Sequence, residues 1–81
     1  MKLKELIQWV DEGREIEFDY EGKRYSITYF YNGDKREISF CEFYKDPTDV
    51  TTVEQLLRIP VNNKPLEKVW EKLRLEDMDI F

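Results

Sequence analysis

Glu15, Glu17 and Asp19 alternate with apolar residues, and this spacing places three carboxylates on one face of an extended strand. Neighbouring carboxylates then lie about 6.6–6.8 Å apart, a separation compatible with hydrolysis catalysed by a pair of carboxyl groups. Such catalysis also needs a cleft and surroundings that separate the two pKa values, and a strand with one solvated face offers neither. The three carboxylates therefore indicate either a strand edge protected by charge or a surface that recognises a partner.

The residue types that most other active sites need are missing. The chain has no histidine, the commonest general base and the commonest metal ligand. Its one cysteine, Cys41, excludes an internal disulfide and a cysteine-based zinc site. Ser26 and Ser39 lack a histidine partner, and the glycines serve as turn and cap residues, so no phosphate-binding loop is expected. We therefore predict no enzyme, no catalytic residue, no metal and no cofactor.

Charge is the remaining clue to function. The 81 residues include 13 basic and 18 acidic ones, for a formal charge of −5, which argues against direct binding of nucleic acid. Residues 11–21 form one acidic cluster, with six acids and a single base, Arg14, and Glu76, Asp77 and Asp79 form a second near the C-terminus. Carboxylates repeated every ~6.8 Å approximate two 3.4 Å base rises of a nucleic-acid strand. The clusters predict either a surface that enters a basic groove of another protein or charge that serves solubility alone.

The length and the apolar pattern predict one domain over residues 1–81. No apolar run has the length of a signal peptide or of a membrane-spanning helix. Together with the lone thiol, this indicates a reducing, intracellular compartment, and we expect a cytoplasmic protein.

Two kinds of periodicity predict the first half of the fold. Leu3, Leu6, Ile7 and Val10 form one face of a helix over residues 2–12, closed by Gly13. The period then changes to two, which predicts strands over residues 15–20, 23–31 and 34–44, joined by turns at residues 21–22 and 32–33. The three strands form an antiparallel meander.

The two turns predict the register of the meander. The first places Ile16 opposite Ile27, and the second places Ile27 opposite Ile38; Phe18, Tyr25 and Phe40 form a parallel row. One face of the sheet is therefore apolar. The opposite face carries the acids of the first strand.

The second half of the chain predicts two more helices. Asp46-Pro47 ends the third strand, and Thr51 with Glu54 fits a capping box that opens a short helix. Pro65 suits the first position of a last helix. Met78 and Ile80 either add an edge strand or belong to a loose tail. The predicted class is α+β, in the order α-β-β-β-α-α, with the helices packed on one face of the sheet.

Most aromatic residues fall between Phe18 and Tyr44, and we expect them in the core. Phe30 and Phe43 lie on the opposite face in the predicted register, where they can anchor a protein partner. The predicted partner-binding residues are Glu15, Glu17, Asp19, Glu76, Asp77, Asp79, Phe30 and Phe43.

The element order is similar to that of double-stranded-RNA-binding domains, but residues 51–55, Thr-Thr-Val-Glu-Gln, lack the basic helix start of that family. In size, charge and element order the whole chain resembles the small acidic proteins of phages and mobile elements, among them anti-CRISPR proteins that mimic DNA. The resemblance is one of pattern and carries no site residues across. It implies a phage-encoded inhibitor of a host defence nuclease.

Two functions thus remain open. The first is a non-enzymatic protein that binds another protein through its acidic surface, with a basic nucleic-acid-binding protein as the more specific expectation. The alternative is a structural or assembly module without a nucleic-acid-related role, which forms a homodimer at the third-strand edge near Phe43 and Tyr44. The chain is then a monomer in the first case and a homodimer or complex subunit in the second.

Overall fold

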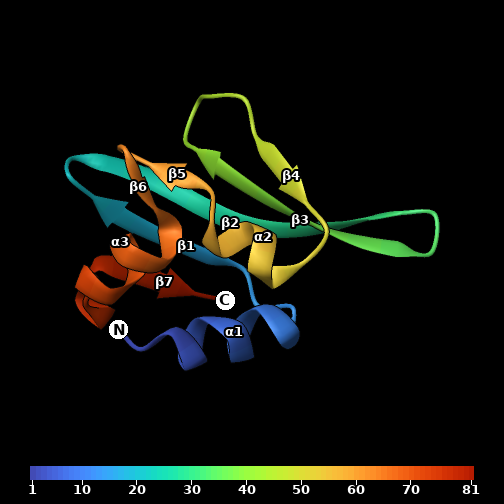
Figure 1. The fold of residues 1–81 in the computed structure, drawn as a ribbon, viewed down its shortest axis with the longest axis horizontal. Helices are drawn as coiled ribbons and strands as arrows, with labels where there is room; N and C mark the ends of the chain where they lie inside the picture. The colour runs from blue at the N-terminus through green and yellow to red at the C-terminus, as the bar shows by residue number, and fades with distance from the viewer.

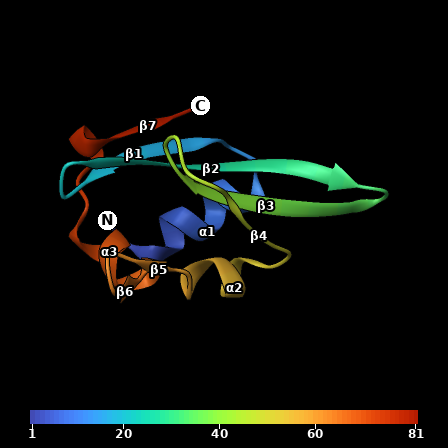
Figure 2. The same ribbon diagram turned by 90° about the horizontal axis from the view of Figure 1, so that it is seen from above.

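The computed structural model describes all residues, 1–81, and consists of a five-stranded antiparallel sheet with three helices on one side (Figures 1 and 2). The strand order is β4-β3-β2-β1-β7, and a separate two-stranded ribbon pairs β5 with β6. The elements are α1 (Leu3–Asp11), β1 (Ile16–Tyr20), β2 (Lys23–Asn32), β3 (Lys35–Glu42), β4 (Thr48–Val50), α2 (Val53–Leu57), β5 (Pro60–Val61), β6 (Lys64–Pro65), α3 (Leu66–Lys72), the 3-10 turn η1 (Leu75–Asp77) and β7 (Met78–Ile80).

The predicted α+β class, with an antiparallel sheet, is confirmed, but the prediction of three strands is wrong. β4 and β7 extend the meander at its two edges. β4 was missed because its three residues are too few to show a period of two. Of the two alternatives for Met78 and Ile80, an edge strand or a loose tail, the structure shows the edge strand: β7 pairs Ile80 with Ile16 and Met78 with Phe18. The tail is therefore part of the sheet. The longest helix, α1, has nine residues, and none of the helices could span a lipid bilayer.

The first hairpin has the predicted register. Ile16 lies opposite Ile27, and Phe18 lies opposite Tyr25. Both turn residues, Glu21 and Gly22, have positive φ angles of 49° and 79°. Two positive φ angles are what the tightest two-residue hairpin turn needs to match the twist of its strands.

The second hairpin is shifted by two residues from the predicted register. Asn32 pairs with Lys35, so Gly33 and Asp34 form the turn, and Ile27 lies opposite Phe40 instead of Ile38. Of the turn residues only Gly33 has a positive φ, 68°, which fits a turn that begins on glycine. Because the shift is even, every side chain stays on its predicted face and the apolar rows survive.

The helix ends follow local hydrogen bonding. At the end of α1 the amide of Gly13 donates to Val10 O at 3.0 Å and that of Arg14 donates to Trp9 O at 2.9 Å. This is the Schellman arrangement, and Gly13 takes its left-handed position with φ 74°, as predicted.

The predicted starts of α2 and α3 are each wrong by one residue. The N-cap of α2 is Thr52, with Gln55 as its capping-box partner, where Thr51 and Glu54 were predicted. The carboxamide oxygen of Gln55 accepts from the amides of both threonines, which selects the later start. Pro65 is the residue before α3 and ends β6, because its extended ψ of 147° lies outside the helical range.

The helix side of the sheet holds one hydrophobic core of 16 buried residues, none of them polar. Trp70 of α3 is at its centre. Its ring packs edge-on against Phe18 at 6.3 Å and against Trp9 at 6.1 Å between centroids. Its indole N–H donates to Lys2 O at 3.1 Å. One side chain therefore joins α3 to the sheet and to the start of α1.

The β2–β3 hairpin continues beyond the rest of the sheet (Figures 1 and 2). β1 pairs with β2 only as far as Ile27, and β4 pairs with β3 only from Ile38. We call residues 28–37 the arm. At its base the hydroxyl of Tyr29 donates to Arg14 O at 2.7 Å, and the guanidinium of Arg36 lies 4.9 Å from the centroid of the Tyr29 ring. These contacts fix the arm to the body.

Replacing Trp70 or Phe18 by alanine tests the core. Both side chains have no exposed surface. We expect either change to lower the free energy of unfolding in urea by about 3–5 kcal/mol, since it leaves a cavity and removes aromatic contacts. Tyr44→Ala is the control, because that residue is 99% exposed. A loss below about 1 kcal/mol for both core variants would contradict this account.

Alkaline titration tests the base of the arm. Burial raises the pKa of Tyr29 to about 12, since Arg36 only partly offsets it. Because folding favours the protonated phenol, stabilisation by Tyr29 is complete below about pH 10 and is lost as the pH rises toward 12. In an ultraviolet titration of the native chain, we expect Tyr29 to be the last tyrosine to ionise. This last transition should be absent in Tyr29→Phe. Tyr44→Phe must leave that late transition in place.

Candidate functional site

The side of the sheet that faces away from the helices is uncovered, and we call it the open face (Figure 2). The register assigns it one continuous row of Asp79, Glu17, Ser26 and Cys41 across four strands. A second row consists of Thr28, Ser39 and Asp49. The middle of the open face thus carries small, half-buried side chains, which make it flat.

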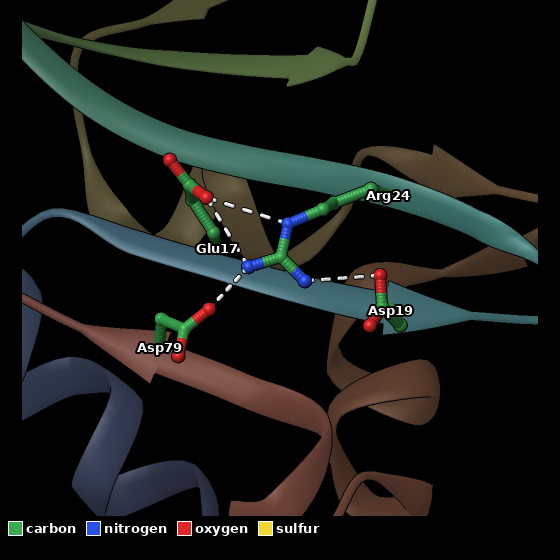
Figure 3. Close-up of polar contacts among 4 residues, drawn as sticks. All are labelled: Glu17, Asp19, Arg24 and Asp79. Atoms are coloured by element: carbon green, nitrogen blue, oxygen red, sulfur yellow. Dashed lines mark hydrogen bonds and ion pairs between the residues drawn. The ribbon is translucent and has the colours of Figure 1, made fainter.

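Arg24 of β2 organises the acidic end of the open face (Figure 3). Its guanidinium lies 3.2 Å from Glu17 Oε1 and 3.0 Å from Asp19 Oδ1, and it also pairs with Asp79 of β7. We call these four residues the Arg24 cluster. Glu17 and Asp79 are direct cross-strand partners, and like charges in that position repel. The guanidinium from the neighbouring strand offsets this repulsion.

The electrostatics of the Arg24 cluster leave it negative. The hydrogen bond to Asp19, followed by those to Asp79 and Glu17, raises the pKa of Arg24 well above its usual range, so the guanidinium stays charged. Three carboxylates then share one cation. The side chain of Arg24 is 28% exposed and that of Asp79 is 62% exposed, so an approaching cationic surface can reach the acids.

The structure distributes the predicted acidic residues over more than one place. Glu17, Asp19 and Asp79 meet in the Arg24 cluster. Glu15 is exposed just before β1, and its carbonyl accepts from the Phe81 amide at 2.8 Å. Glu76 and Asp77 instead pair with Arg74, at 3.0 Å and 3.6 Å. Three tail acids within four residues of sequence therefore contact two different arginines.

The two predicted aromatic anchors lie toward opposite ends of the open face. Phe30 of the arm is 40% exposed and lies opposite Glu37. Phe43 follows β3, and its ring centroid is 5.9 Å from the guanidinium carbon of Arg24. Because Arg24 and Phe30 are six residues apart on β2, they are separated by about 20 Å.

The edge of the third strand, where an assembly contact is predicted near Phe43 and Tyr44, is partly covered by β4. From Ile38 to Phe40 β3 lies between β2 and β4. Phe43 and Tyr44 are in the turn that follows the strand, where Tyr44 has a φ of 69°. β4 was not predicted, and it limits the open part of this edge to the residues after Phe40. A homodimer through Phe43 and Tyr44 stays a prediction.

Arg24 and Asp49 are members of the open face that the sequence prediction missed. Arg24 had a detectable signal, because the correct register of the first hairpin places it directly opposite Asp19. Asp49 had none, because its place depends on β4.

The surface of the protein has two hollows. No group of three or more acidic or cysteine side chains is placed to hold a metal ion. The larger of two hollows, of about 500 Å³, lies on the helix side between α1, β3 and the start of α2. Its lining is about half apolar, and the remaining residues are charged or polar: Ile7, Val10, Ile38 and Val53 with Lys4, Gln8, Asp11, Arg36 and Thr51. In comparisons with known proteins, no family model, curated protein or solved structure matches the chain.

Removing the guanidinium tests the Arg24 cluster. We expect Arg24→Met to lower the free energy of unfolding by about 1 kcal/mol at low ionic strength, because Glu17 and Asp79 then repel without compensation. In about 1 M NaCl, which screens the repulsion, Arg24→Met should regain part of the lost stability. Adding Asp79→Asn to Arg24→Met should also restore part of it, because one of the two repelling charges is removed. Arg58→Met, at an exposed residue outside the sheet, is the control. An equal loss at both salt concentrations would argue against a charge effect.

Proposed function

We propose that this chain is a non-enzymatic protein that binds a basic surface of another protein through the open face of its sheet. The supporting observation is the charge of that face, which has five carboxylates against two cations, Arg24 and Lys35. The five carboxylates are Glu17, Asp19, Glu37, Asp49 and Asp79. Because the helices cover only the other side, these groups are free to meet a partner.

The shape of the open face favours a macromolecule over a small ligand. Its centre is flat, and aromatic residues stand near its ends, an arrangement suited to an interface with anchors and a charged rim. Asp49 and Asp79 lie on the two outer strands, and these strands are four spacings, or about 19 Å, apart. Opposite charge on a partner would steer the encounter and fix its orientation.

The more specific proposal is that the basic partner is a host defence nuclease in the cytoplasm and that the chain comes from a phage or mobile element. The carboxylates occupy the place of nucleic-acid phosphates in the nuclease groove, as the resemblance to anti-CRISPR proteins implies. Glu37 and Asp49 take part in no salt bridge, so their full charge is available to a partner. The chain then competes with DNA for the groove and catalyses nothing.

A cleavage assay tests this proposal. Purified RNA-guided DNA nucleases are incubated with the chain, and cleavage of a target plasmid is measured. We expect inhibition by the native chain, and inhibition at least about tenfold weaker for Glu37→Lys with Asp49→Lys, since two attractive charges become repulsive. Asp11→Lys with Glu12→Lys is the matched control, because it changes the net charge equally at the end of α1, on the other side of the sheet.

Two further measurements test separately whether the charge of the open face is needed and whether the nuclease covers that face. Inhibition should weaken as the salt concentration rises, and a bound nuclease should slow the reaction of Cys41, the only thiol, with a thiol reagent. Inhibition that is equal in both double variants would contradict binding by the open face. If the native chain inhibits none of the RNA-guided nucleases tested, the more specific proposal is ruled out.

A further inference from the structure

Most free edges of the sheet carry features that prevent another strand from pairing with them. β4 has three residues, follows Pro47 and contains Asp49. β7 also has three residues and contains Asp79. The free edge of β3 in the arm consists of charged residues, at positions 35–37. Short length, proline and charge are the usual means by which natural sheets avoid edge-to-edge association.

The free edge of β2 in the arm has none of these features. Residues 28–32 read Thr-Tyr-Phe-Tyr-Asn, without a charge or a proline. β1 ends its pairing at Ile27, so no strand of the chain covers this edge. Phe30 is 40% exposed and Tyr31 is 71% exposed. An uncharged, aromatic edge that projects from the body is a surface able to accept a strand (Figures 1 and 2).

The backbone groups that this edge offers follow from the turn. Asn32 pairs with Lys35 around the two-residue turn, so its N–H and C=O point toward β3. Successive residues of a strand alternate in this direction. Tyr29 and Tyr31 therefore direct their N–H and C=O groups away from β3, toward the free edge. These are the groups a new strand would bind.

We propose that a second copy of this chain pairs with the free edge of β2, antiparallel and about a two-fold axis at Phe30. In this register Phe30 lies opposite Phe30 of the second copy in a non-hydrogen-bonded pair, where cross-strand side chains are closest. Tyr29 lies opposite Tyr31 of the second copy, and each such pair exchanges two backbone hydrogen bonds. The edge is thus complementary to itself, because every aromatic residue meets another aromatic residue and no charge is buried.

This dimer enlarges the open face. A two-fold axis perpendicular to the sheet leaves both open faces on the same side, so the two sheets form one continuous surface. Phe30, which is an outer anchor in the single chain, becomes its centre. The inference does not depend on the proposed binding of a nuclease, since it rests on the edge alone.

Sedimentation equilibrium of the full chain tests the dimer. We expect the native chain to change from its monomer mass of 9.9 kDa to twice that mass within about 1 µM to 1 mM, the range of a small interface. Phe30→Lys and Phe30→Glu should each be monomeric over this range, because two like charges then face each other across the axis. A mixture of these two variants in equal amounts should form a dimer again, since opposite charges now meet.

The mixing step separates a failed interface from a failed fold, because misfolded variants would not recover the dimer. Tyr31→Pro is a second test, since it removes an N–H that points to the free edge and none that bonds to β3; it should also be monomeric. A native chain that stays monomeric up to about 1 mM, or variants that dimerise as the native chain does, would overturn the proposal. A mixture that remains monomeric would overturn the register at Phe30.

Discussion

The packing of Trp70 is the interaction on which the rest of the structure depends. The chain has three short helices, and none of them buries enough apolar surface to be stable alone. Trp70 contacts the sheet at Phe18 and α1 at Trp9, and it binds a backbone carbonyl at the start of the chain. The sheet, α1 and α3 thus stabilise one another through this one side chain. The same packing leaves the other side of the sheet uncovered, because all the helices are used on one side.

The uncovered side of the sheet is polar, and its charges are organised around Arg24. Arg24 holds three carboxylates from two strands, and it joins the last strand of the chain to the centre of the sheet. The acids therefore have a structural task as well as any role in recognition. An acidic surface built in this way keeps its shape when a partner approaches, which lowers the ordering cost of binding.

The sequence predicted those parts of the fold that depend on local patterns. The apolar spacing of Leu6 and Val10, the left-handed Gly13 and the alternation from Ile16 to Tyr20 each determine their own neighbourhood. It did not predict β4 or fully resolve β7, because a three-residue strand is stabilised by its neighbour more than by its own sequence. The site followed the same rule. Glu17 and Asp19 were found from their alternation, whereas the contribution of Asp49 depends on a strand that only tertiary contacts reveal.

The register of the second hairpin has a consequence for how this fold can vary. A shift by two residues left the apolar rows intact, so a hairpin that keeps its two-residue turn can gain or lose an even number of residues without changing the inner and outer sides of its strands. An odd change around the same two-residue turn would shift the register by an odd number and move the side chains of one strand to the opposite face. The length of the arm can therefore change in steps of one residue on each strand, while the body of the protein stays the same. Related chains would be free to differ most in the part that extends furthest from the core.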